Sequence, residues 1–128
     1  MTPASLGKFD IVAFAPTIDA ARAVEFYRDT IGLPLISQDS FAAVFDAHGI
    51  PLRVTTVPKP FTPQPFTVLG WNVPDIASSA RELTAAGVKF ERYMPAQDEL
   101  GIWTAPGGAK VAWFQDPDGN ILSLTQFS

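Results

Sequence analysis

The sequence predicts an α+β fold made of two tandem βαβββ modules. Segments with strand and helix patterns follow one another in the same order in each half of the chain. Helix start signals at Asp19 and Asp75 lie 56 positions apart, and helix end signals at Gly32 and Gly87 lie 55 apart. A strong hairpin signal, DPDGN at 116–120, precedes the last expected strand. Agreement of these landmarks indicates an internal duplication.

The first module spans about residues 8–57. Alternating apolar residues predict a strand at 9–15, and an apolar stripe with helical spacing predicts a helix at 18–30. The stripe consists of Ala20, Ala23, Val24, Tyr27 and Ile31. Thr17 or Asp19 can cap this helix, and Gly32 can end it in the left-handed conformation. Three short strands are expected at 35–37, 41–46 and 52–57.

A linker and a second module complete the chain. Four prolines within 58–65 exclude a helix or a central strand, so this segment is expected to be an extended linker. Module 2, about 66–127, should have a strand at 67–73 and a helix capped by Asp75 and ended by Gly87. Further strands are expected at 88–93, 101–104, 110–115 and 121–125. In the DPDGN turn, Pro117 fixes φ and Gly119 accepts a positive φ.

Composition narrows the possible functions of this single domain, residues 1–128. The net charge is −4 with a pI near 4.7 and no Lys/Arg cluster, so nucleic acid is not an expected partner. Zero Cys excludes disulfides, thiolate nucleophiles and Cys-bound zinc, and the single His48 excludes paired-His sites within one subunit. No stretch is apolar enough to span a bilayer, and no secretory signal is visible. We expect no membrane partner and a cytoplasmic location.

Three motifs carry a resemblance to a known superfamily. They are the segment 19–33 with its Phe26-Tyr27 pair and Gly32, the segments 73–76 and 85–88 around the second helix, and DPDGN followed by a strand. With two βαβββ halves, the chain resembles the vicinal oxygen chelate superfamily, which includes glyoxalase I, extradiol dioxygenases, fosfomycin-resistance enzymes and bleomycin-resistance proteins. The resemblance implies two curled sheets that enclose a cavity, where metal-using members hold a divalent ion.

The resemblance also implies where metal ligands would stand. Counting from the shared landmarks places the four family positions at Val12, Arg53, Val68 and Ser123. Only Ser123 has a side chain that can ligate even weakly, and Arg53 would repel a cation. Asp10, on the same face as Val12, is the nearest carboxylate. We therefore expect neither a metal nor any other cofactor.

Strand alternation then predicts what lines the cavity. The residues expected to bind a ligand are Phe14, Arg53, Asn72, Trp113 and Ser123. Inside an apolar cavity, a guanidinium can bind a carboxylate, phosphate or enolate oxygen through two parallel hydrogen bonds. The alternative for Arg53 is pairing with a local acid such as Asp46 or Glu91, or solvation at the rim.

For several other side chains, both a structural role and a functional role are consistent with the sequence. Trp71, Trp103 and Trp113 could stack on a planar ligand or serve packing, and for Trp71 the strand parity favours packing against the helix. His48 is expected to be exposed in a turn. The polar loop at 94–101 could cover the cavity mouth. If the protein is catalytic, Arg53 would stabilise an oxyanion, and Glu91, Tyr93 or Asp10 would serve as acid or base.

Three functions compete on these grounds. The first is a metal-free module that binds and sequesters a small organic ligand, as bleomycin-resistance proteins do. The second is a lyase, isomerase or dioxygenase of the superfamily with a non-standard site. The third is an interaction protein with a filled cavity. Because relatives of this size pair, a homodimer is expected. The residues do not identify the ligand.

Overall fold

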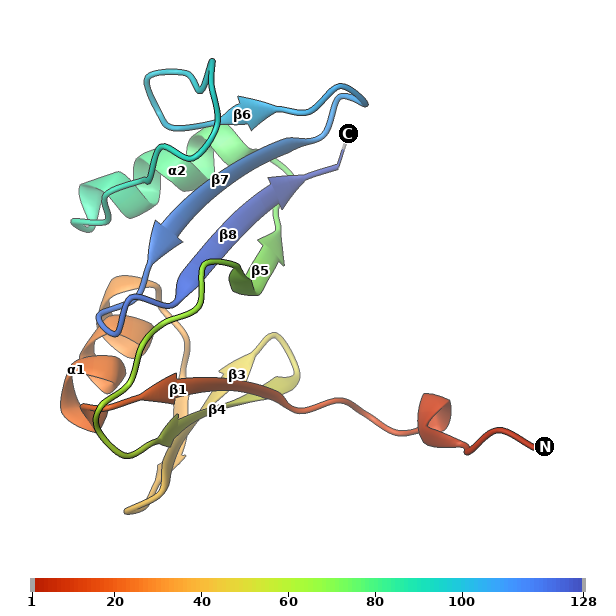
Figure 1. Cartoon of the computed structure of the whole chain (residues 1–128), viewed down its shortest axis with the longest axis vertical. Coiled ribbons are helices and arrows are strands. Elements are labelled where there is room, and N and C mark those ends of the chain that lie inside the picture. Colours follow the sequence, from red (N-terminus) through yellow and green to blue (C-terminus); the bar gives the residue numbers. More distant parts are fainter. Residues whose placement is uncertain (1, 128) are drawn as a thin grey trace.

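Two four-stranded sheets with one shared topology form the protein, as a computed structural model of the chain shows for residues 2–127 (Figure 1). Sheet 1 has the order β1-β4-β3-β2 and sheet 2 the order β5-β8-β7-β6. In each sheet the first strand runs parallel to the last, and the other pairs are antiparallel. The repeated order confirms the predicted α+β architecture of two tandem modules. The sheets remain separate and do not close into a barrel.

Module 1 contains strands β1 (Ala13–Thr17), β2 (Leu35–Gln38), β3 (Ala42–Ala47) and β4 (Ile50–Thr56). Its helix begins as α1 (Ala20–Val24) and continues as a π-helical segment, Glu25–Thr30. The expected helix is therefore present but not α-helical throughout. The expected strand at 9–15 is wrong in its first half, because regular pairing begins only at Ala13.

Module 2 contains strands β5 (Thr67–Asn72), β6 (Trp103–Thr104), β7 (Lys110–Gln115) and β8 (Ile121–Gln126), and helix α2 (Ile76–Ala85). The strand expected at 88–93 is not formed, since only Glu91 pairs there, as an isolated bridge to Trp113. The side chain of Gln97 provides the reason. It accepts from the backbone N–H groups of Tyr93 and Met94 at 2.8 Å each and donates to the carbonyl of Glu91 at 2.9 Å, so these groups bond to a side chain.

The duplication extends to the helix ends. Asp19 accepts a hydrogen bond from the backbone N–H of Arg22, and Asp75 accepts one from that of Ser78, as N-caps do. Gly32 and Gly87 have φ of +82° and +98° just beyond the helices. Both predicted start and end signals are confirmed. None of the helices in residues 2–127 is long and apolar enough to cross a membrane.

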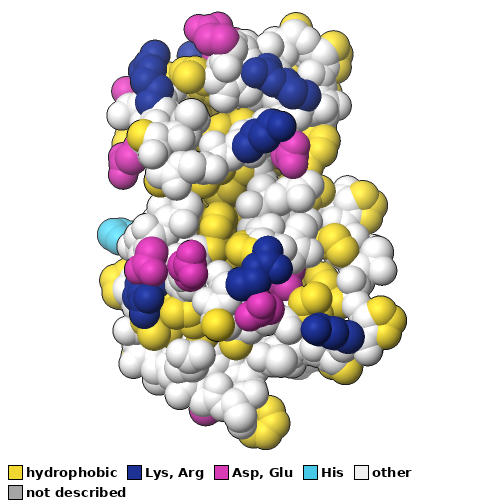
Figure 2. Space-filling model, turned by 90° about the vertical axis from the view of Figure 1, so that its left-hand side faces the viewer, with side chains coloured by type: hydrophobic (Ala, Val, Ile, Leu, Met, Phe, Trp, Pro, Cys, Tyr) yellow, Lys and Arg dark blue, Asp and Glu magenta, His cyan; other side chains and the backbone are white. Residues whose placement is uncertain are grey.

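One face of each sheet carries the core, and the opposite face is left open. Ala15, Leu52 and Val54 on sheet 1, and Ala112 and Leu122 on sheet 2, belong to one buried cluster shared with both helices. We call this side of each sheet the helix face and the other side the open face. Seen from the side where both helices lie, basic and acidic side chains are interspersed, and apolar atoms show between the modules (Figure 2).

Hydrogen bonds join the DPDGN turn of module 2 to module 1. The Asn120 side chain donates to the carbonyl of Pro16 at 2.9 Å, and the Ile18 N–H donates to Asp118 at 2.9 Å. The Tyr27 hydroxyl donates to Asp116 at 2.7 Å. These contacts hold the two modules together and leave both open faces on the outside.

Candidate functional site

The strand register places two equivalent rows of side chains on the open faces. By strand alternation these rows point away from the helices. Each row crosses the first, last and neighbouring strand of its sheet at the same level. The rows are Phe14, Arg53 and Val44 on sheet 1, and Gly70, Ser123 and Trp113 on sheet 2. The predicted faces of Phe14, Arg53, Ser123 and Trp113 match this register.

The row on sheet 1 combines an exposed aromatic ring with a cation. Phe14 is 60% exposed, while Arg53 is half-buried and forms no ion pair within the described residues. Asp46 forms no ion pair with Arg53 within the described residues, and its carboxylate accepts a hydrogen bond from the Gly49 N–H. Arg53 instead lies near Asp39. The pKa of Asp39 is lowered first by hydrogen bonds from the backbone of residues 41 and 42, with a smaller attraction from the Arg53 charge.

One level further along sheet 1 lies a buried hydroxyl. Thr55 follows Arg53 by two residues and therefore shares the open face. Its Oγ1 is buried and has no hydrogen-bond partner within residues 2–127. A buried hydroxyl without a partner is costly, and this one is already covered by the protein's own atoms.

The row on sheet 2 pairs a glycine with a buried serine. A Cβ built on Gly70 would lie 2.7 Å from Ser123 Oγ, closer than such contacts occur. A side chain at position 70 would therefore push against the hydroxyl and cover it. Gly70 therefore leaves room for the Ser123 hydroxyl, although the serine as a whole is buried.

An aromatic cluster stands beside that row. The Trp113 ring lies 5.9 Å from that of Tyr93 and 6.1 Å from that of Trp103, between ring centroids. Trp113 and Tyr93 also line a hollow of about 350 Å³. The other residues lining it are Pro65, Phe66, Thr67 and Ile121. The hollow is mostly apolar, as expected for a small-molecule site.

Gln97 positions one wall of the hollow. Its amide holds the backbone at Glu91, Tyr93 and Met94, and Arg92 donates to backbone carbonyls of the same loop, including that of Glu99. The loop at 94–101 is thereby tied to the segment that carries Tyr93. No sequence pattern pointed to Gln97. Phe66 was also missed, although its place after the proline-rich linker could have suggested contact with the sheet.

The predicted site residues fall into two groups. Ser123, Trp113 and Tyr93 lie together on sheet 2, and Glu91 bridges to Trp113 through its backbone. Asn72 is exposed at the end of β5 on the same sheet. The second group, Phe14 and Arg53, is on sheet 1. The single chain does not enclose both groups in one cavity, because its two sheets remain separate.

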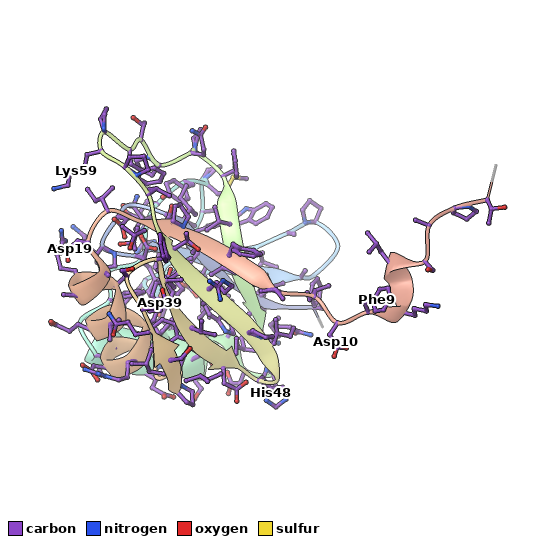
Figure 3. The ribbon with its side chains drawn as sticks, turned by 90° about the horizontal axis from the view of Figure 1, so that it is seen from below. Phe9, Asp10, Asp19, Asp39, His48 and Lys59 are labelled. Carbon is purple, nitrogen blue, oxygen red and sulfur yellow. The ribbon has the colours of Figure 1, made fainter. Side chains whose placement is uncertain are left out.

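The remaining candidates lie outside the hollow. Asp10 and Val12 precede β1, and Asp10 lies on the N-terminal segment, away from the body of the chain (Figure 3). His48 is exposed in the β3–β4 turn, as expected. Trp71 stacks on Phe114, with centroids 6.4 Å apart, on the helix face. This confirms the packing role that its parity predicted.

The residues at the four family ligand positions do not fit a divalent metal. Val12 and Val68 have no donor atom, Arg53 is a cation, and Ser123 offers one neutral hydroxyl. Divalent metals in proteins prefer carboxylate, imidazole or thiolate ligands. Within residues 2–127, no group of three His, Cys, Asp or Glu side chains is arranged to hold a metal ion.

Comparison with known proteins places the chain in a family. A model of the Glyoxalase/Bleomycin resistance protein/Dioxygenase superfamily matches residues 8–124. Among curated proteins, none matches the chain with significance. The chain is similar in structure to a glyoxalase/bleomycin resistance protein/dioxygenase from Alicyclobacillus acidocaldarius, with 15% identity, a TM-score of 0.72, and 94% and 92% of the two chains covered.

Two further solved structures share the fold. TioX from Micromonospora sp. ML1 has 21% identity and a TM-score of 0.70 over 94% of this chain and 99% of its own. A lactoylglutathione lyase from Agrobacterium tumefaciens has 16% identity and a TM-score of 0.71 over 93% of each chain. At these identities the likeness supports the fold, and the matching family model gives the membership. The chain belongs to the Glyoxalase/Bleomycin resistance protein/Dioxygenase superfamily.

Proposed function

We propose that this protein binds a planar organic molecule without a metal and holds it without chemical change. The cluster of Trp113, Tyr93 and Trp103 beside an apolar hollow carries this proposal. Flat indole and phenol faces attract planar rings, and offset or edge-on contacts between rings add to simple burial. The Ser123 hydroxyl, which lies between Gly70 and Trp113 in the register, supplies a polar contact next to the rings.

We also propose that the functional unit is a homodimer. The chain exposes 8125 Å², whereas monomers of 13.8 kDa expose about 6600 Å². The excess of about 1500 Å² is larger than the roughly 800 Å² that each partner buries in a standard interface. In a dimer, the open face of sheet 1 of one copy can cover that of sheet 2 of the other. Arg53 would then face the aromatic cluster and could bind an anionic group on the ligand.

Catalysis is the second candidate, and Arg53 is the observation in its favour. A guanidinium without an ion pair, on an apolar face, can stabilise an oxyanion. Its proposed acid or base partners, Glu91 and Tyr93, lie beside the other sheet. The hypothesis that the protein is an enzyme therefore also requires a second copy of the chain to bring these groups together.

Calorimetric titration with 2-naphthoate and with neutral 2-naphthylmethanol tests the binding proposal. Trp113→Phe should weaken naphthoate binding roughly tenfold, the loss expected for a central aromatic contact. Trp71→Phe is the matched control, because Trp71 packs on the helix face, and it should bind as the unchanged protein does. Equal losses in both variants, or no binding of either probe at about 1 mM, would overturn the proposal.

The same titration separates the role of the cation. Arg53→Gln should weaken naphthoate binding and leave binding of the neutral alcohol unchanged. A chemical change of a bound ligand, detected by mass spectrometry after long incubation with candidate keto acids, would favour the enzyme instead.

A further inference from the structure

A second hollow lies on the helix face of sheet 2, on the other side of the sheet from the aromatic cluster of Trp113. Its volume is about 160 Å³. Helix α2 packs on β7 and β8, and the hollow lies between this helix and the β5 side of the sheet. We call it the helix-face hollow. Its lining includes Trp71 and Phe114 of the sheet, Ser79, Glu82 and Leu83 of α2, and Ile31.

The inner wall of the helix-face hollow is apolar. The Trp71 and Phe114 rings stack at 22° with centroids 6.4 Å apart, and both line it. Leu83 of α2 adds a half-buried side chain. Ile31, which follows the π-helical segment of module 1, contributes to the wall from the other module. A water molecule needs about two to four polar partners, which apolar side chains do not provide, so an apolar group is the favoured occupant.

The size of the helix-face hollow fits one aromatic ring. An apolar cavity of about 150 Å³ holds a molecule of benzene. The helix-face hollow, at about 160 Å³, is of the same size. Trp71 is only half-buried, so part of its indole is accessible to a ligand. We therefore expect a ligand with one ring and a short chain that reaches the rim.

The rim of the helix-face hollow carries a negative charge. Glu82 and Ser79 both line the hollow from α2, and three positions apart they are neighbours on one face of the helix. The Glu82 side chain is exposed and forms no ion pair with any residue from 2 to 127. No Lys or Arg is among the described residues that line the hollow. A carboxylate without a paired cation, beside an apolar wall, favours a ligand with a positive charge.

We propose that the helix-face hollow binds a primary arylalkylamine as its ammonium ion. The ring lies against Trp71 and Phe114, where contacts between aromatic rings add to burial. The ammonium group donates to the Glu82 carboxylate and the Ser79 hydroxyl, since it has three protons and no acceptor. Trp71 also attracts the cation through its ring face. This site goes beyond the ligand site proposed above, because it lies on the opposite face of sheet 2 and prefers the opposite charge.

Nuclear magnetic resonance of the full chain with 2-phenylethylamine tests this assignment. The three tryptophans report on the place of binding, because Trp71 is on the helix face and Trp103 and Trp113 belong to the aromatic cluster. The indole N–H signal of Trp71, identified by its loss in Trp71→Phe, should shift with a dissociation constant of about 1 mM. The signals of Trp103 and Trp113 should stay unchanged. Shifts of Trp103 and Trp113 in place of Trp71, or no shift at about 10 mM amine, would overturn the proposal.

Charge variants measure the contribution of Glu82. The neutral analogue 2-phenylethanol should bind the unchanged protein roughly fivefold more weakly than the amine does, as expected for one exposed ion pair. Glu82→Gln should make the two affinities equal. Glu99→Gln is the matched control and should keep the preference, because it removes the same charge from an exposed loop position outside the hollow. Equal loss of the preference in both variants would indicate attraction by the net charge and would contradict the site.

Naphthoate separates this proposal from the ligand site on the open faces. Glu82 repels its carboxylate, so Glu82→Gln should leave naphthoate binding at the open face unchanged. Trp113→Phe should weaken naphthoate binding and leave amine binding unchanged. Normal amine binding without naphthoate binding would overturn the proposed function alone. Normal naphthoate binding without amine binding would overturn the helix-face site alone.

Discussion

The Tyr27 hydroxyl donates a hydrogen bond to Asp116 Oδ2 at 2.7 Å, across 89 positions of sequence and between the two modules. Asp116 also accepts from the Asn120 side chain at 2.8 Å and from two backbone N–H groups. Burial raises the pKa of Asp116 more than these hydrogen bonds lower it. Burial, with the nearby Asp116 charge, raises the pKa of Tyr27 as well, so the phenol keeps its proton as the donor.

Tyr27→Phe should destabilise the protein by about 1.5–3 kcal/mol at neutral pH, as for loss of a hydrogen bond to a charged group. The effect should shrink in acid. Because the folded pKa of Asp116 is raised, the folded chain binds more protons than the unfolded chain between the ordinary and the raised pKa. Stability from this group therefore falls as pH rises through that window. Loss of the Tyr27 hydrogen bond raises the folded pKa of Asp116 further. The free energy of unfolding that the variant loses relative to the unchanged protein therefore grows with pH.

Urea unfolding of both proteins between pH 3 and pH 7 measures this difference. Tyr93→Phe is the control, because the Tyr93 hydroxyl only accepts a 3.3 Å bond from Gln115 at an exposed position. That variant should unfold like the unchanged protein at every pH. If the loss of unfolding free energy in Tyr27→Phe stays constant with pH, the charge of Asp116 contributes nothing to this contact between the modules.

The sequence could predict the fold because the duplication repeats local signals. Asp19 and Asp75 cap helices, and Gly32 ends one with a positive φ, all through short-range chemistry that a sequence displays. The errors have long-range causes. Pairing at 9–12 fails because the register brings Pro51 opposite Val12, and register is set by the whole sheet.

The alternation of side chains along each strand predicted which face the site residues point to. It could not predict which of these residues lie close together. Arg53 and Ser123 occupy equivalent rows, as the spacing implied, but on separate sheets. The distance between two sheets depends on packing and assembly, which no local pattern encodes. The role of Gln97 was unpredictable for a related reason, since a loop glutamine has no preferred partner until the loop folds.

Gly119→Ala should destabilise the protein by about 1–3 kcal/mol, the cost of a strained backbone position. Gly119 has a φ of +87°, and a Cβ there would lie 2.9 Å from Pro63 of the linker. The substitution therefore strains the DPDGN turn and pushes the linker away. Gly107→Ala is the control, because Gly107 has open space and no positive φ. Thermal unfolding of the two variants measures the difference, and equal melting temperatures would contradict it.

Metal analysis tests the donor set at the family ligand positions. Two valines, an arginine and a serine offer one neutral oxygen, so no divalent ion should survive exhaustive dialysis after incubation with Fe, Mn, Ni or Zn. Elemental analysis of untagged protein gives the stoichiometry, and the expected value is near zero. One retained ion per chain would mean that ligands come from elsewhere, for example from Asp10, the nearest carboxylate to Val12 in the sequence. Loss of that ion in Asp10→Asn would identify the source, and the enzyme reading would then take precedence over simple binding.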